Sequence, residues 1–369
     1  MGKKVLILSN KDTGLYFFRR EVIEAIISEG YELYISVPPG DYTDVFCDMG
    51  CKVIQTDIDR RGKNPFKDLK LIFFYFNLIK KIKPLVVLTY TIKPNIYGGV
   101  ACGALSVAQI ANITGLGTEI EKGGITSKTL LTFYRASLYK SKCVFVQNSA
   151  IDRCLEKYGI AKGKRIVIPG SGVNLNDHQY IEYPTDESII HFLYIGRLMK
   201  DKGSDELLYA AKATKKKHPN IVFDIVGRCD EEEYHDIIRE YDEKGIIVFH
   251  GFQKDVNPYL ERAHALIQPS YHEGLSNVLL EAAATGRPVL SSRVPGCQET
   301  FEEGVSGMGF EAKSGTSLCN TIEDFLRLSN EEKREMGLNG RKKVEKEFSR
   351  EIVVDAYIKQ INSLQQQKR

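Results

Sequence analysis

The chain has 369 residues, of which 43% are hydrophobic and 27% charged, and its formal net charge is only +3. This composition excludes a disordered chain, a collagen-like repeat and a small disulfide scaffold, and the length indicates two domains. No run reaches the ~18 uncharged apolar residues that a membrane-spanning helix needs, and Val5–Leu8 is too short for a signal peptide. We therefore expect a cytoplasmic protein whose eight cysteines are reduced thiols.

In the first half of the chain, short apolar runs alternate with helical patterns such as the amphipathic stretch Leu15–Ser28. The runs predicted to be buried strands are Lys4–Ser9, Tyr31–Val37, Leu85–Tyr90, Ala108–Ile113, Lys142–Val146 and Arg165–Ile168. Strands separated by helices are typical of βαβ units, in which a parallel sheet is covered by helices on both faces.

The second half repeats this pattern after a segment, residues 169–187, that is rich in Pro, Gly, Asn and Asp and has no periodicity. The predicted strands are Ile189–Ile195, Ile221–Val226, Ile246–Phe249, Ala265–Gln268 and Pro288–Ser291. The predicted helices include Ser204–Lys217, Glu231–Glu243, Ser276–Thr285 and a final helical region with Ser329 as an N-cap.

These elements predict an α/β protein of two Rossmann-like, doubly wound parallel-sheet domains that face an inter-domain cleft. We place the first domain at residues 1–175, a linker at 176–187 and the second domain at 188–348. Residues 349–369 should form a C-terminal helix that packs back on the first domain. Ligands of parallel sheets bind beyond the carboxyl ends of the strands, so two such sheets can hold two substrates.

Positive charge is concentrated in one segment of the first domain. Between Arg60 and Lys93, nine basic residues accompany a single acid, Asp68. Within it, Phe66–Lys83 is apolar and aromatic in the middle and rich in lysine at its ends. We expect a helix buried against the sheet, whose basic rim docks on the anionic inner leaflet of a membrane. The lysines proposed to contact the membrane are Lys70, Lys80, Lys81 and Lys83.

The segment Gly196–Gly203, with the sequence GRLMKDKG, joins a predicted strand to a predicted helix. Arg197 and Lys202 flank this turn, where a diphosphate would meet two cations and the positive end of a helix. A solvated turn with two surface cations is the alternative interpretation of this segment alone.

A second constellation follows the strand Ala265–Gln268 and opens the next helix. It places Glu273 before that helix and Glu281 two turns along it, so that each carboxylate could accept hydrogen bonds from sugar or ribose hydroxyls. The backbone amides of residues 274–277 point at any anion near the helix start. Two acids near a helix start are also explained by the helix dipole alone, but not together with the Arg197 and Lys202 turn.

GRLMKDKG followed by HEGLSNVLLE resembles the retaining glycosyltransferases of family 4, which have the two-domain GT-B architecture. Further matching segments are Val226–Arg228, Gly251–Val256, Pro269–Tyr271, Ala284–Val289 and Glu299 with Gly304 and Gly307. The first domain resembles the subset that builds bacterial capsule, O-antigen or lipid-linked glycans on a polyprenyl-diphosphate carrier. This narrower resemblance rests on Pro38–Tyr42, Asn64–Phe66, Thr91–Gly98 and Gly115–Gly117.

The resemblance implies that Arg197 and Lys202 hold the donor diphosphate, that Glu273 contacts the transferred sugar and that Glu281 binds the ribose. It also implies donor contacts from the second domain at Gly196, Arg228, Phe252, Lys254 and the amides of Gly274, Leu275, Ser276 and Asn277. In the first domain, a loop containing Asp12, Thr13 and Gly14 would close over the donor. No metal or other cofactor is implied, because Arg and Lys replace a divalent cation.

One departure from the family concerns the acceptor side. Many relatives place a histidine of the first domain near the reacting centre, but no histidine precedes His178 in this chain. A retaining front-face displacement needs no enzymatic base, since the leaving phosphate can take the acceptor proton. Lys93, Asn95 and Thr114 are the residues expected in this region.

The expected activity is metal-independent transfer of a hexose-type sugar from a UDP-sugar to a polyprenyl-diphosphate-linked saccharide. The transferred sugar would be a hexose, an N-acetylhexosamine or a uronic acid. The enzyme would lie peripherally on the inner face of the cell membrane, without a nucleic acid partner. The alternatives are a same-fold transferase with a soluble acceptor, a UDP-sugar 2-epimerase, and a sugar-nucleotide-binding module without catalysis.

Overall fold

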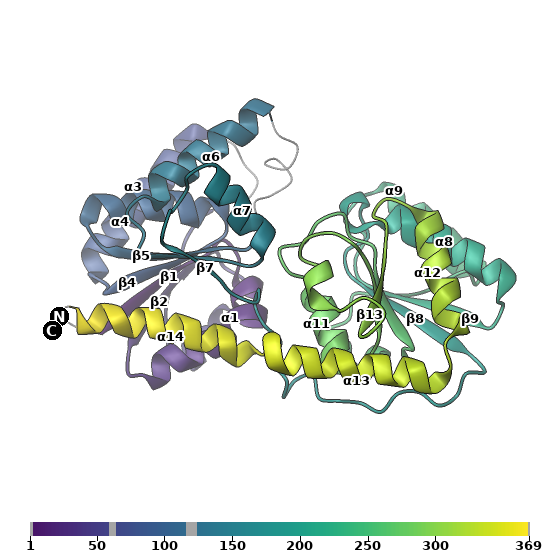
Figure 1. Ribbon diagram of the computed structural model, residues 1–369. Helices are drawn as coiled ribbons and strands as arrows, with labels where there is room; N and C mark the ends of the chain where they lie inside the picture. The colour runs from purple at the N-terminus through teal and green to yellow at the C-terminus, as the bar shows by residue number, and fades with distance from the viewer. Residues whose placement is uncertain (1–2, 59–63, 116–123, 368–369) are drawn as a thin grey trace. The chain divides into compact units, whose positions relative to one another are not determined.

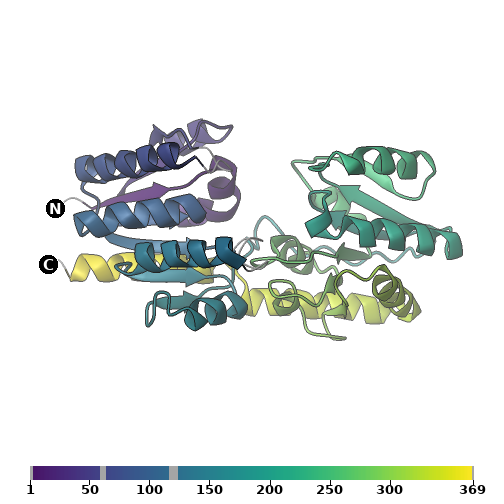
Figure 2. The same ribbon diagram turned by 90° about the horizontal axis from the view of Figure 1, so that it is seen from above.

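The structure is a computed structural model and describes residues 3–58, 64–115 and 124–367. It divides into two compact units, one formed by Met1–Ser171 with Arg350–Arg369 and the other by Gly172–Ser349. In each unit a parallel sheet carries helices on both faces, as Figure 1 shows from the side and Figure 2 from above. The predicted doubly wound α/β architecture is therefore confirmed for each unit.

The first unit is built on seven parallel strands in the order β3-β2-β1-β4-β5-β6-β7. The strands are β1 (Lys4–Leu8), β2 (Glu32–Val37), β3 (Lys52–Gln55), β4 (Val86–Tyr90), β5 (Ala108–Ile113), β6 (Cys143–Val146) and β7 (Arg165–Val167). The order reverses between β1 and β4, which makes the carboxyl ends of these two strands the switch point where ligands of such sheets bind.

The helices of the first unit cover the two faces of this sheet. They are α1 (Asp12–Ser28), α2 (Thr43–Asp48), α3 (Pro65–Ile82), α4 (Gly99–Leu105), α6 (Gly124–Leu138), α7 (Ser149–Lys157) and α14 (Arg350–Gln366), with a π-helical turn at Pro94–Gly98. Alternate residues of β1 point to opposite faces. Val5 and Ile7 pack with α1 and α14, whereas Leu6 and Leu8 pack with α3 and α4 (Figure 1).

The C-terminal helix α14 belongs to the first unit, although 178 residues of the other unit precede it in the chain. Tyr357 is fully buried in the core beneath the sheet. At the start of the helix, Arg350 Nη1 lies 2.5 Å from Glu21 Oε2 on α1. Near its end, Tyr31 OH donates to Asn362 Oδ1 at 2.7 Å. Apolar packing and polar contacts along its length thus hold α14 on the first sheet.

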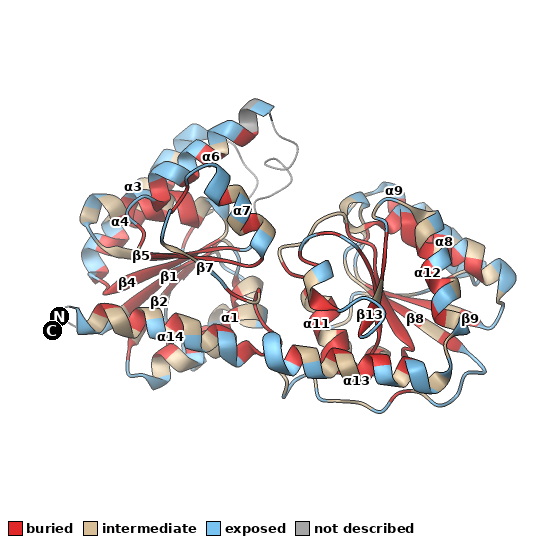
Figure 3. Ribbon diagram, viewed as in Figure 1, coloured by how far each residue is buried: buried red, intermediate tan, exposed pale blue. Residues whose placement is uncertain are grey.

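The second unit has six parallel strands in the order β10-β9-β8-β11-β12-β13. They are β8 (Ile190–Ile195), β9 (Ile221–Val226), β10 (Val248–Gly251), β11 (Ala265–Gln268), β12 (Val289–Ser292) and β13 (Gly307–Phe310). Its helices are α8 (Ser204–Lys217), α9 (Glu233–Glu243), α10 (Asn257–Arg262), α11 (Asn277–Ala284), α12 (Gly315–Arg327) and α13 (Asn330–Glu347). Side chains of α8, α9 and α12 pack on one face and those of α10 and α11 on the other, and the strands between them are buried except for the edge strand β10 (Figure 3).

Two edge strands, β3 and β13, were not predicted from the sequence. β3 lies at the edge of the first sheet, and its four residues are exposed or only half-buried, so no apolar run marks it. β13 lies at the edge of the second sheet and has the sequence GMGF, in which two of four residues are glycine. Glycine is depleted in strands because it has no side chain to pack.

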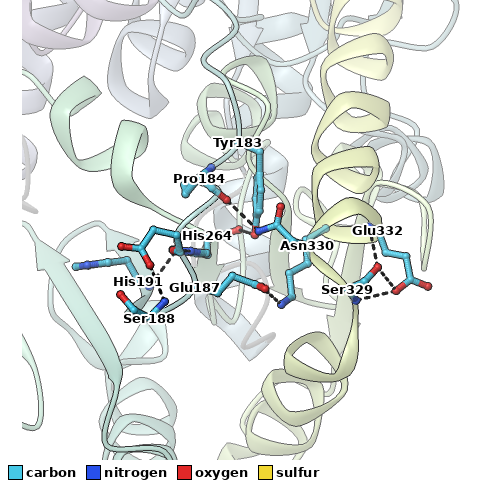
Figure 4. A network of polar contacts seen from close by, with 11 residues as sticks. Tyr183, Pro184, Glu187, Ser188, His191, His264, Ser329, Asn330 and Glu332 are labelled. Atoms are coloured by element: carbon cyan, nitrogen blue, oxygen red, sulfur yellow. Dashed lines mark hydrogen bonds and ion pairs between the residues drawn. The ribbon is translucent and has the colours of Figure 1, made fainter.

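The segment predicted as a linker is part of the second unit from Gly172 onward. Tyr183 is buried and its hydroxyl donates to the carbonyl of His264 at 3.1 Å. On α13, Asn330 donates to the carbonyl of Pro184 at 3.0 Å, and Lys333 Nζ lies 2.7 Å from Glu187 Oε1 (Figure 4). The segment predicted as a linker, residues 176–187, therefore packs on the second unit through Tyr183, Pro184 and Glu187.

Arg287 completes this attachment. Its side chain is fully buried, and its guanidinium donates at 2.7–3.0 Å to the carbonyls of four residues, Leu260, Glu261, Ile181 and Glu182. Burial lowers the pKa of Arg287 to about 10. Arg287 therefore ties the segment around Ile181 to α10 and to the start of β12 through backbone carbonyls rather than through an acid.

A further polar cluster surrounds the buried Asp224 on β9. His191 Nδ1, His250 Nε2 and Arg262 Nη2 lie 2.7, 2.6 and 2.6 Å from its carboxylate. Burial raises the pKa of Asp224, but the hydrogen bonds from the two histidines and the arginine outweigh it and lower the pKa to about 2. This carboxylate therefore links β8, β9, β10 and α10.

Candidate active site

The candidate site begins at the turn that follows β8. Gly196 donates its amide to Val226 of β9 at 2.9 Å, and Tyr194 OH donates to the carbonyl of Arg197 at 2.8 Å. Gly203 ends this turn at a φ of 73°, where a Cβ atom would lie 2.1 Å from the carbonyl oxygen of Pro269. Only glycine fits here, because the turn after β8 presses on the turn after β11, and α8 starts directly afterwards.

The contact between these two turns brings together Lys202 and Glu273, which are far apart in the chain. Lys202 Nζ donates to Glu273 Oε1 at 2.6 Å, and both side chains are mostly buried. Glu273 Oε1 also accepts from Ser270 Oγ at 2.8 Å and from Gln268 Nε2 at 3.3 Å. Neighbouring parallel strands thus fix a carboxylate and an ammonium at the carboxyl edge of the second sheet.

Arg197 has a partner that sequence analysis did not include. Its Nη1 lies 2.7 Å from Asp230 Oδ2, on the loop that follows β9, and about half of the arginine side chain is exposed. The signal in the sequence was the position of Asp230 two residues after Arg228, at the end of the strand adjacent to β8. Because parallel neighbours end at the same edge, residues that follow β8 and β9 meet there.

The loop before α11 is fixed through its backbone. Ser276 donates its amide to the carbonyl of Gly296 at 2.7 Å, and Gly296 donates its own amide to Glu299 Oε2 at 2.7 Å. The Ser276 amide, a predicted anion donor, is therefore engaged by a backbone carbonyl, and its side chain makes no capping hydrogen bond. The side chain of Leu275 is buried in the core between α11 and α13.

Three other predicted donor-binding residues surround this loop. Gly274 is half-buried, and Glu281 is half-buried in the second turn of α11. Asn277, the first residue of α11, has a buried side-chain Oδ1 without a hydrogen-bond partner. A buried acceptor of this kind is usually satisfied, so Asn277 Oδ1 has the chemistry to receive a ligand hydroxyl.

Two further predicted donor contacts, Arg228 and Phe252, also meet. The guanidinium of Arg228, after β9, lies 4.1 Å from the ring centroid of Phe252, after β10. Both side chains are exposed, as is that of Lys254 on the same loop as Phe252. An exposed arginine stacked on an aromatic ring offers a flat surface and hydrogen-bond donors to a planar ligand.

In the first unit, the predicted loop at Asp12, Thr13 and Gly14 is instead the first turn of α1. Asp12 is buried, and its Oδ2 accepts from the amide of Tyr42 at 3.0 Å. Thr13 Oγ1 is buried without a partner, and a Cβ added to Gly14 would meet no atom within 4 Å. The glycine here leaves open space over a helix start instead of enabling a loop conformation.

The predicted acceptor region lies at the carboxyl ends of β4 and β5, but its residues differ in whether their side chains are exposed or already paired within the first unit. Lys93 Nζ lies 2.7 Å from Asp68 Oδ1 on α3, and Thr114 is exposed. Asn95 is buried, and its side chain accepts from Thr89 Oγ1 at 2.7 Å and donates to the carbonyl of Asn112 at 2.8 Å. The side chain of Asn95 is thus engaged within the first unit, and its acceptor contact stays a prediction.

The backbone at this edge has an unusual conformation. Thr91, directly after β4, has a φ of 72°, and the π-helical turn Pro94–Gly98 follows it. A positive φ is a strained conformation for a β-branched residue, and π-helical turns are frequent at functional sites. Both features lie next to the switch point of the first sheet.

The outer face of α3 carries the predicted membrane contacts. Phe66, Leu69 and Phe73 are exposed at spacings of three and four residues, so they lie on one side of the helix. The side chains of Lys70, Lys80, Lys81 and Lys83 are exposed as well. Arg60, Arg61 and Lys63 of the basic segment, and Leu116 and Gly117, lie outside the described residues. Across the described parts of the chain, the helices are all too short or too polar to cross a bilayer.

Residues 3–58, 64–115 and 124–367 contain no group of three or more His, Cys, Asp or Glu side chains arranged to hold a metal ion. The cationic groups near the carboxyl edge of the second sheet are instead Arg197, Lys202 and Arg228. These side chains have the chemistry to bind a diphosphate and to neutralise charge on it.

Two family descriptions match the chain. "Glycosyl transferase 4-like" matches residues 4–148, and "Glycosyl transferases group 1" matches residues 179–343. The N,N'-diacetylbacillosaminyl-diphospho-undecaprenol alpha-1,3-N-acetylgalactosaminyltransferase of Campylobacter jejuni is 26% identical over 340 residues, which are 88% of this chain and 89% of the relative.

Solved structures show the same fold at low identity. A glycosyltransferase from Rickettsia africae has a TM-score of 0.81 at 17% identity, over 98% of both chains. The Anabaena protein HepE in complex with UDP-glucose has a TM-score of 0.77 at 16% identity, over 98% of this chain and 99% of that one. The chain therefore belongs to the glycosyltransferases and is an enzyme of the GT-B fold. Its first unit matches the glycosyl transferase 4-like family, and its second unit matches the glycosyl transferases group 1 family.

Proposed function

We propose that this glycosyltransferase moves a hexose-type sugar from a UDP-sugar to a polyprenyl-diphosphate-linked saccharide, with retention of the anomeric configuration and without a metal ion. The observation that carries the proposal is the pair formed by Lys202 and Glu273, 2.6 Å apart, with Lys202 on the same turn after β8 that carries Arg197. It supplies cations for a diphosphate and a carboxylate for sugar hydroxyls at one edge of one sheet.

In the proposed reaction, the bond between the anomeric carbon and the β-phosphate oxygen breaks while an acceptor hydroxyl oxygen bonds to the same face of that carbon. The proton of the hydroxyl passes to the departing phosphate oxygen, so no enzymatic base is required. Arg197 and Lys202 stabilise the negative charge that grows on the diphosphate as the bond breaks. Glu273 orients the transferred sugar through its hydroxyls.

The preference for a UDP-sugar is supported by the exposed stack of Arg228 on Phe252, which suits a planar base. The unpartnered Oδ1 of Asn277 suits a sugar or ribose hydroxyl. A protein of the same fold, HepE, binds UDP-glucose in its solved structure. Thr13, whose buried hydroxyl also has no partner, is the candidate contact from the first unit.

The lipid-linked acceptor is supported by the C. jejuni relative, a transferase named for its diphospho-undecaprenol-linked acceptor. It is also supported by the outer face of α3, where Phe66, Leu69 and Phe73 accompany exposed lysines. Apolar side chains insert at the headgroup boundary, while each lysine adds about 1 kcal/mol of attraction to anionic lipids. We therefore place the enzyme on the inner face of the cell membrane.

Vesicle flotation tests this placement. Reversing the charge of Lys80, Lys81 and Lys83 to Glu should abolish binding to vesicles that contain anionic lipid and leave nucleotide binding intact. The matched control reverses three exposed lysines of α8 in the second unit, Lys212, Lys216 and Lys217. Equal flotation of the wild type and both variants would contradict the membrane-docking role of α3.

A thermal-shift panel tests the donor site. UDP, GDP, ADP and several UDP-sugars are added in EDTA, because a ligand that binds only the folded protein raises its apparent midpoint. We expect a shift with UDP and with one UDP-sugar, and loss of that shift in Arg197→Ala. A shift with GDP or ADP but not with UDP would contradict the proposed donor, and a shift that requires Mg²⁺ would contradict metal independence.

A further inference from the structure

The loops that hold Arg197 and Asp230 are bound to each other by their backbones. Leu198 donates its amide to the carbonyl of Arg228 at 2.7 Å, and Asp230 donates its amide to the carbonyl of Leu198 at 3.1 Å. Leu198 itself is fully buried. The pairing of β8 with β9 thus continues beyond the strands and fixes where the two charged side chains start.

The space between these loops is tight. Gly227, at the end of β9, has a φ of 155°, and a Cβ there would lie 1.7 Å from the carbonyl oxygen of Gly196. Close backbone approach keeps Arg197 and Asp230 within reach of each other, and Arg197 Nη1 lies 2.7 Å from Asp230 Oδ2. The backbone contact between the two loops therefore places Arg197 and Asp230 where their side chains can pair.

The two cations of the site are held differently. Lys202 and Glu273 are 21% and 15% exposed, and Glu273 has two further donors, so this pair is fixed. Arg197 and Asp230 are 49% and 32% exposed, so both can exchange partners with solvent or a ligand. The arginine that is expected to bind the donor diphosphate is thus occupied by an exchangeable carboxylate.

We infer that Asp230 is a competing counterion for the donor diphosphate and that it sets the affinity for the nucleotide. This inference rests on the proposed function. When the donor binds, its diphosphate takes Arg197 from Asp230. When the nucleoside diphosphate leaves, Asp230 takes the arginine back, which favours product release.

The size of the effect follows from the exposure of the pair. Exposed ion pairs are worth little, up to about 1 kcal/mol, which corresponds to about fivefold in affinity. Replacing Asp230 with Asn keeps the size of the side chain and removes its charge. Binding of UDP should therefore become about two- to fivefold tighter in Asp230→Asn.

The matched control is Glu232→Gln. Glu232 lies two residues further along the same loop and is exposed, and its side chain does not cap α9. The Glu232→Gln substitution also removes one negative charge near the site, so it measures how the overall negative charge of this loop affects ligand affinity. Glu231 is unsuitable as a control because its carboxylate accepts from the amide of Lys200 at 2.9 Å.

The experiment titrates UDP, and in parallel inorganic pyrophosphate, into wild type, Asp230→Asn and Glu232→Gln by calorimetry at low salt. We expect Asp230→Asn to tighten both ligands two- to fivefold, Glu232→Gln to change them by less than 1.5-fold, and high salt to shrink the difference. In steady-state assays, KM for the donor and the UDP inhibition constant should fall together while kcat does not rise. Structural damage in Asp230→Asn would weaken ligand binding, so tighter binding distinguishes the proposed competition for Arg197 from such damage.

Equal or weaker binding by Asp230→Asn, or equal tightening by Glu232→Gln, would overturn the inference. If the wild type binds pyrophosphate but not UDP, the proposed donor fails, and the pyrophosphate data still decide the role of Asp230. Binding of neither ligand would overturn both.

Discussion

Lys202 offers the sharpest test of the donor site, because its replacement separates catalysis from stability. Lys202→Met removes the ammonium 2.6 Å from Glu273 and leaves an apolar side chain of similar length. Loss of one charged contact to the leaving diphosphate should raise the barrier by about 2–4 kcal/mol, or about 30- to 1,000-fold in kcat. Glu273 keeps its hydrogen bonds from Ser270 and Gln268, so the free energy of unfolding should fall by only about 1–2 kcal/mol.

A second substitution should reverse the loss of stability in Lys202→Met without restoring activity. The double variant Lys202→Met with Glu273→Gln removes both charges, so its unfolding midpoint should return to within a few degrees of the wild type. Its kcat should stay as low as that of Lys202→Met or lower. Lys200→Met is the control, because Lys200 is exposed in the same turn.

The assays are release of UDP from the donor in the presence of acceptor, and thermal unfolding of the same samples. A Lys202→Met variant that keeps more than a third of wild-type kcat would refute a catalytic role for this ammonium. Recovery of activity in the double variant would show instead that Lys202 acts only by neutralising Glu273.

Three further predictions concern the framework around the site. Arg287→Met should lower the free energy of unfolding by at least about 3 kcal/mol, since it removes the buried guanidinium that donates to four backbone carbonyls. Arg334→Met, at an exposed ion pair, should leave the free energy of unfolding nearly unchanged, and urea unfolding checks both variants. The pKa of Asp224 in the folded protein lies below its usual value, so its charge adds about 2 kcal/mol to the free energy of unfolding above pH ~4. This contribution is lost as the pH falls from about 4 to 2, and Asp224→Asn should flatten that part of the acid-unfolding curve. Thr91→Gly should raise the free energy of unfolding by about 1 kcal/mol, because glycine adopts the positive φ without strain. An unchanged or lower midpoint of urea unfolding would contradict the conclusion that the backbone of Thr91 is strained.

The sequence indicated the repeated βαβ pattern because most strands in both sheets are buried on both faces and read as continuous apolar runs. It did not indicate β3, whose residues are exposed or half-buried at the sheet edge, or β13, in which two of four residues are glycine. It also gave no indication that residues 172–187 pack on the second unit. That packing depends on Arg287, which lies a hundred residues further along the chain and donates to backbone carbonyls that any residue carries.

The candidate site was predictable where chemistry depends on residue type and spacing. Lys202 and Glu273 follow neighbouring strands that end at one edge, so their contact follows from topology. Contacts that depend on the path of the backbone were not predictable. The amide of Ser276 is used by Gly296, and Asp12 through Gly14 form a helical turn because α1 begins earlier than its apolar pattern.

The central claim is sugar transfer with retention from a UDP-sugar to a lipid-linked acceptor. The most direct measurement incubates the enzyme with an α-linked UDP-hexose or UDP-N-acetylhexosamine, an undecaprenyl-diphosphate-linked saccharide and EDTA, and determines the anomeric configuration of the product by NMR. Our account predicts an α-linked product that forms without metal and is lost in Arg197→Ala. A β-linked product, or a product that forms only after a divalent metal is added, would contradict it.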